Sequence, residues 1–224
     1  MDICEFVRSF KRYSTLSNEE ILNLKQLDLS GNHLTSLPES IGELSNLQTL
    51  RLSRNQLASL PESIGKLTNL QTLRLSRNQL TFLPESFGNL CNLEKLYLYN
   101  NQLTFLPENI GNLSKLQVLD LSHNQLTFLP DSIGNLSNLK ILYLSNNRLT
   151  FLPESIGNLS KLEKLYLKHN ELNSQTQSVL KTLVMTNSVI THLTTDNFDF
   201  SEELLRNLRK EPAPGRTTLK SVEF

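Results

Sequence analysis

A spacing of 23 residues runs through most of this 224-residue chain and limits its possible folds more than any other feature. The pattern L-x-x-L-x-L-x-x-N-x-L occurs seven times in steps of 23, with first leucines Leu24, Leu47, Leu70, Leu93, Leu116, Leu139 and Leu162. Six units continue with L-P-x-x, a large apolar residue and glycine. A unit this short cannot bury its own leucines, so successive units must stack into a solenoid.

Each part of the unit predicts a local structure. The L-x-L segment alternates like a short strand, with its leucines inward and the residues between them outward. The asparagine at the ninth position lies where the strand ends, so seven such amides predict a ladder that satisfies backbone groups. Proline followed by an acidic residue suits the first position of a short helical turn, and the glycine is expected to end that turn.

These motifs resemble the leucine-rich repeats of the 23-residue class, and the resemblance extends from Leu24 to about Leu172. That class includes the Ras-related scaffold group of animals and plants and many bacterial proteins. The resemblance implies an α/β fold: a curved, horseshoe-like leucine-rich-repeat solenoid. A parallel β-sheet would line its concave face, with short helical turns on the convex side and helical caps at both ends.

The segments before and after the regular repeats predict how the chain is divided. We expect an N-terminal cap, a solenoid of six full repeats and a truncated seventh, a C-terminal helical cap and a flexible tail, over residues 1–23, 24–172, 173–211 and 212–224. Ser17 or Asn18 should cap a short N-terminal helix. Further helices should begin near Ser174 and after Ser201, and the chain from Arg216 onward should be mobile.

Candidate binding residues are those that vary between units at the outward positions of the strands. Tyrosine and arginine are enriched at binding hot spots. The repeated segment LRLSRNQL gives four arginines, and later units give tyrosines, with Val118 and Ile141 beside them. The predicted partner-binding residues are Arg51, Arg54, Arg74, Arg77, Tyr97, Tyr99, Asp120, His123, Tyr143, Tyr166 and His169. The alternatives are that outward strand positions tolerate many residues, that tyrosine simply favours sheets, and that the arginines reflect a duplication.

A second series recurs at the thirteenth position of four consecutive units, as Phe82, Phe105, Phe128 and Phe151. We expect these rings to stack and brace the solenoid. The alternative is an exposed apolar ridge for a partner.

Composition and spacing argue against several functions. The 22 basic and 22 acidic residues balance, which gives no charge excess for nucleic acid or a membrane surface. No segment resembles a cleaved export signal or a membrane span. Cys4 and Cys91 lack zinc or disulfide spacing, and His33, His123 and His169 lie too many strands apart to share a metal. We therefore expect a cytoplasmic, monomeric non-enzyme without catalytic residues, cofactor or metal.

The functional hypothesis is a protein-interaction module that binds a partner protein on its concave face, without contacts to nucleic acid or membrane. The near-identical units resemble leucine-rich-repeat effectors that bacterial pathogens such as Legionella secrete into host cells, which implies a host partner and export without a cleaved signal peptide. One alternative is an endogenous cytosolic scaffold of the Ras-related kind that regulates a small GTPase or phosphatase. Another is a recognition subunit of an enzyme complex such as a ubiquitin ligase.

Overall fold

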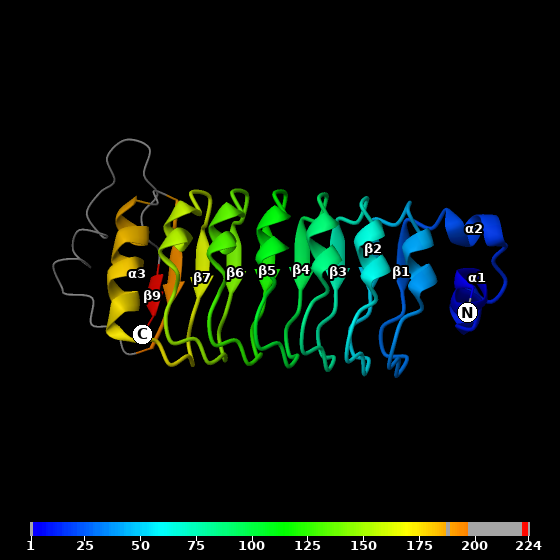
Figure 1. The fold of residues 1–224 in the computed structure, drawn as a ribbon, viewed down its shortest axis with the longest axis horizontal. Helices are drawn as coiled ribbons and strands as arrows, with labels where there is room; N and C mark the ends of the chain where they lie inside the picture. Colours follow the sequence, from blue (N-terminus) through cyan, green and yellow to red (C-terminus); the bar gives the residue numbers. More distant parts are fainter. Residues whose placement is uncertain (1, 187–188, 197–220, 224) are drawn as a thin grey trace.

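A parallel sheet forms the length of the molecule (Figure 1). The computed structural model describes residues 2–186, 189–196 and 221–223. Within them each strand pairs with the next in chain order, and the strands are β1 (Gln26–Asp28), β2 (Thr49–Arg51), β3 (Thr72–Arg74), β4 (Lys95–Tyr97), β5 (Val118–Asp120), β6 (Ile141–Tyr143), β7 (Lys164–Tyr166), β8 (His192–Thr194) and β9 (Ser221–Glu223). The predicted solenoid is confirmed.

The repeat spacing becomes the register of the sheet. Leu27 pairs with Leu50 and Leu50 with Leu73, each 23 residues further on. From β1 to β7 the central leucine of each strand is fully buried, whereas its two neighbours face outward. Residues at the same position of successive units therefore form rows across the sheet face.

Short 3-10 helices lie opposite the sheet and cover the leucine core (Figure 1). They are η2 (Glu39–Glu43), η3 (Glu62–Lys66), η4 (Glu85–Asn89), η5 (Glu108–Asn112), η6 (Asp131–Asn135) and η7 (Glu154–Asn158). Two details of the prediction are wrong. Proline is the residue before the helix, as at Pro38 with φ −70° and ψ 150°, and the glycine lies inside the turn. Glycine is required by close packing, because a Cβ at Gly42 would lie 2.7 Å from the carbonyl oxygen of Ser63.

The predicted asparagine ladder is present. Asn101 donates from Nδ2 to the carbonyl oxygens of Leu75 (3.0 Å) and Leu98 (2.9 Å), and its Oδ1 accepts the backbone N–H of Leu80 (3.0 Å). Equivalent bonds recur at Asn55, Asn78, Asn124, Asn147 and Asn170. Asn32 is the exception, since no repeat precedes it: it is exposed and donates to Ser30 within its own unit.

The N-terminal cap contains α1 (Ile3–Arg8), η1 (Lys11–Tyr13) and α2 (Asn18–Leu22). Ser17 caps α2: its hydroxyl accepts the N–H of Glu20 (3.2 Å), and the Glu20 carboxylate accepts the N–H of Ser17 (2.8 Å). These hydrogen bonds lower the pKa of Glu20. Helix α1 was not predicted, although its N-cap Asp2 and its buried Ile3 and Val7 carry the usual signals.

The C-terminal cap differs from a purely helical one. Helix α3 (Ser174–Thr186) begins where predicted, and the expected residues, Val179, Leu180, Leu183 and Val184, are buried. The sheet then continues through β8 and β9, so the prediction of a wholly helical cap followed by a tail is wrong at these two strands. Leu193 pairs with Leu165 and is buried, which extends the leucine core beyond the last repeat. The helix predicted after Ser201 lies outside the described residues.

Candidate functional site

The outward side chains of consecutive strands form a row that we call the central row. It consists of the last residue of each strand from β2 to β7, namely Arg51, Arg74, Tyr97, Asp120, Tyr143 and Tyr166. Each is the direct register partner of the next, at the ~4.8 Å spacing of adjacent strands. All are partly exposed except Arg74, which is exposed. The structure thus brings these six predicted residues together in one line.

A second row, the edge row, lies just beyond the strand ends and consists of the predicted residues Arg54, Arg77, Tyr99, His123 and His169. The Arg77 guanidinium carbon lies 5.9 Å from the Tyr99 ring centroid. The Tyr99 and His123 rings meet edge to face at 5.0 Å and 77°. Three neighbouring units are therefore linked by contacts between side chains at this edge.

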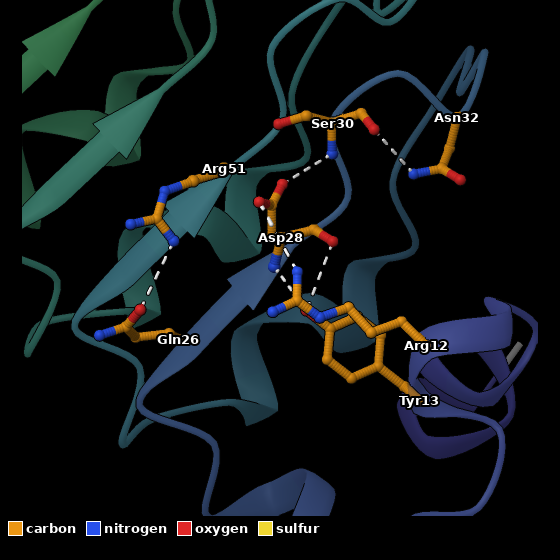
Figure 2. A network of polar contacts seen from close by, with 7 residues as sticks. All are labelled: Arg12, Tyr13, Gln26, Asp28, Ser30, Asn32 and Arg51. Carbon is orange, nitrogen blue, oxygen red and sulfur yellow. Dashed lines mark hydrogen bonds and ion pairs between the residues drawn. The ribbon is translucent and has the colours of Figure 1, made fainter.

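The arginines do not form one cluster of equivalent cations. Arg74 lies with its guanidinium carbon 4.9 Å from the Tyr97 ring centroid, a second cation–π pair beside that of Arg77. Arg51 reaches Gln26, with 3.5 Å between Nη1 and Oε1, as Figure 2 shows, and Arg54 is exposed. The arginines of the repeated segment and the tyrosines of the later units are thus joined between β3 and β4.

Two tyrosines at the other end of the central row form a flat aromatic surface. The rings of Tyr143 and Tyr166 are stacked, with centroids 4.7 Å apart and planes inclined by 8°. Burial raises the pKa of Tyr143, and the neighbouring Tyr166 and Asp120 raise it further. Because the stack already fixes both rings, a partner would lose little side-chain entropy in binding them.

Asp120 lies in the middle of the central row, between Tyr97 on β4 and Tyr143 on β6. Its Oδ1 accepts the backbone N–H of Ser122 at 3.1 Å. Burial raises the pKa of Asp120, while the Ser122 hydrogen bond and nearby His123 act in the opposite direction. The site therefore has a partly desolvated carboxylate flanked by aromatic residues.

The eighth position of the repeat is conformationally restricted, which the sequence analysis missed. All seven units place it in the left-handed region, for example Arg54 and Arg77 at φ 59° and His123 at φ 54°. Glycine and asparagine suit this conformation, and other residues incur a cost of about 1 kcal/mol. Gly31, Asn100 and Asn146 at the same position were the signal that could have revealed it.

His169 is held by the C-terminal cap. Its backbone N–H donates to the Asp196 carboxylate, and its Nδ1 lies 3.8 Å from Asp196 Oδ2. Of the predicted site residues, it lies nearest the end of the repeats, and this contact ties the edge row to the segment that follows β8.

The phenylalanine series does not stack as predicted. The four rings, Phe82, Phe105, Phe128 and Phe151, are 43%, 44%, 43% and 39% exposed, and among the described residues no aromatic contact joins two of them. The leucine after each one turns inward and is buried, so the phenylalanine must point outward. The series is an exposed apolar ridge away from the central row.

A metal centre and a membrane-spanning helix have no support in the described part of the chain. No three His, Cys, Asp or Glu side chains in it gather closely enough to hold a metal ion. No helix in residues 2–186 and 189–196 is long and apolar enough to cross a membrane. Cys91 is an exposed free thiol, and Cys4 is buried.

These features define a repeat solenoid with an open, chemically varied sheet face. Residues 2–105 and 96–211 match the family described as leucine-rich repeat region. The chain belongs to the leucine-rich-repeat family, whose members generally mediate protein–protein interactions. No curated protein matches it.

Three solved structures illustrate the similarity. A leucine-rich-repeat protein of Leptospira interrogans is 33% identical, over 80% of this chain and 57% of its own, with a TM-score of 0.57. PEPR1 in its complex with AtPEP1 is 38% identical, over 82% of this chain and 26% of its own, with a TM-score of 0.69. The internalin inlF of Listeria monocytogenes is 24% identical, over 88% of this chain and 63% of its own, with a TM-score of 0.61, and shares the fold alone.

Proposed function

We propose that the chain is a non-enzymatic module that binds a partner protein through an extended segment laid across the central row. The observation that carries the proposal is the unbroken line of Arg74, Tyr97, Asp120, Tyr143 and Tyr166 on five adjacent strands. Arginine and tyrosine are the side chains that dominate binding energy at protein interfaces. The PEPR1–AtPEP1 complex, a structure of a similar repeat protein, supports the proposal that the chain binds a partner.

The pre-existing contacts within the row favour binding. The Arg74–Tyr97 pair and the Tyr143–Tyr166 stack hold four large side chains before any partner arrives. Immobilising a free side chain on binding costs roughly 0.5–1.5 kcal/mol, so side chains that are already ordered reduce this cost. Arg51 and Arg54 at the β2 end add positive charge for an acidic part of the partner.

The test is selection of binders from a random peptide library on the immobilised full chain. Tyr143→Ala combined with Tyr166→Ala should weaken the selected peptides at least tenfold, because both anchors are removed. Phe105→Ala combined with Phe128→Ala is the matched control, since it removes two exposed aromatic rings from the ridge and leaves the row intact. Equal binding by the tyrosine variant, or loss of binding only in the phenylalanine variant, would contradict the proposal.

The setting of the interaction stays a prediction. A secreted effector with a host partner, a cytosolic scaffold for a GTPase or phosphatase and a recognition subunit all require the same binding face. They differ in the partner, and mass spectrometry of proteins that bind the wild type but not the tyrosine variant would distinguish them.

A further inference from the structure

Aspartate ends two strands at the repeat position that forms the central row, and in one case the chain itself supplies a cation. Asp28 ends β1 and Asp120 ends β5, at the same position of their repeats. Both carboxylates accept the N–H of the serine two residues later, Ser30 or Ser122, at 3.1 Å in each case. The two aspartates therefore have the same local conformation, and their surroundings can be compared directly.

At Asp28 the N-terminal cap provides a guanidinium and an aromatic ring (Figure 2). Arg12 Nη1 lies 3.9 Å from Asp28 Oδ2, and the Arg12 guanidinium carbon is 5.7 Å from the Tyr13 ring centroid. The Tyr13 hydroxyl accepts the backbone N–H of Asp28 at 2.8 Å, which holds that ring against the strand. Carboxylate, ring and guanidinium thus form one group.

At Asp120 the carboxylate and the rings are present, but Arg74 lies over the Tyr97 ring and not against the carboxylate. Tyr97 and Tyr143 are its register partners on either side, each one strand spacing of ~4.8 Å away. Within the described residues the Ser122 bond is the one hydrogen bond to this carboxylate, and no lysine or arginine pairs with it. The imidazole of His123 also lies near this carboxylate, and its ring is held against Tyr99.

We infer that Asp120, Tyr97 and Tyr143 form a subsite for an arginine side chain of the bound partner, which occupies it as Arg12 occupies Asp28. The inference rests on the proposed function and specifies part of the partner's chemistry. A guanidinium over this carboxylate would lie within the ~6 Å at which a cation and a ring attract each other. It would also offset the desolvation that disfavours the ionised carboxylate in the free protein. Arginine suits the site because its planar group pairs with a carboxylate and stacks on rings at once.

Titration of the ¹⁵N-labelled full chain with N-acetyl-arginine methylamide, followed by NMR, tests the subsite without the partner. The amide of Ser122 is the reporter, since its N–H is bonded to Asp120. We expect a saturable shift in the millimolar range. The neutral analogue N-acetyl-citrulline methylamide should give less than one fifth of that shift at the same concentration.

Two variants complete the experiment. Asp120→Asn keeps an acceptor for the Ser122 N–H and should abolish the saturable shift, whereas Asp28→Asn should leave it unchanged. Equal shifts with the citrulline analogue, or an unaltered titration in Asp120→Asn, would overturn the inference. In the peptide selection, wild type should enrich arginine at one fixed position and Asp120→Asn should not. If the selected peptides do not show this difference, the subsite is contradicted and the proposed function is not. If no peptide is selected although the titration of the chain is normal, the proposed function is contradicted and the subsite is not.

Discussion

Replacing Asn101 with alanine should destabilise the protein by about 3 kcal/mol. The side chain is 7% exposed and makes three hydrogen bonds, two to carbonyl oxygens and one to an N–H group, that connect adjacent repeats. Alanine would leave the Leu80 N–H without a partner in the core, and the carbonyl oxygens of Leu75 and Leu98 would each lose one of their two asparagine donors. The unsatisfied N–H costs roughly 1–3 kcal/mol and each of the two lost hydrogen bonds to a carbonyl oxygen about 0.5–1.5 kcal/mol, so a loss of about 3 kcal/mol is expected.

Urea unfolding monitored by circular dichroism measures this loss, and Asn32→Ala is the matched control. Asn32 has the same position in the first repeat but is exposed and donates one hydrogen bond within its own unit, so its replacement should cost less than about 0.5 kcal/mol. The interpretation of the ladder would be refuted if the two variants lost similar stability, or if Asn101→Ala stayed within about 1 kcal/mol of wild type.

Three further substitutions test packing, backbone conformation and charge. Gly42→Ala should lose about 1–3 kcal/mol in the same assay because its Cβ would lie 2.7 Å from a carbonyl oxygen, whereas Gly157→Ala, with nothing within 4 Å, should be neutral or slightly stabilising. Arg54→Asn should gain about 0.5 kcal/mol by relieving the left-handed arginine at φ 59°, whereas Arg51→Asn in a strand should gain nothing. Asp120→Asn should raise the melting temperature at pH 7. Since the folded pKa of this carboxyl lies above its usual 3.8, the folded state binds more protons between the two values, and stability falls as pH rises through that window. The gain in melting temperature should therefore be complete above the folded pKa and absent below pH 3.8. A gain that does not change with pH would contradict the raised pKa of Asp120.

Much of the fold follows from the sequence because one spacing determines several structural properties together. A strict step of 23 residues gives the order of the strands, their register and the leucines that are buried. It also identifies the outward positions, so the six residues of the central row could be named before the structure was known. Helix α3 was predictable for a similar reason, since apolar residues at helical spacing follow the last repeat.

Only the tertiary structure decided how those residues interact. The spacing places Arg74 beside Tyr97 and Tyr143 beside Tyr166, but side-chain rotamers turn one pair into a cation–π contact and the other into a stack. The outward phenylalanines follow from the inward rotation of the leucines after them. The strands β8 and β9 and the approach of Arg12 to Asp28 arise where the repeat ends. A periodic sequence determines which backbones are neighbours, whereas side-chain contacts and caps depend on packing that the period does not encode.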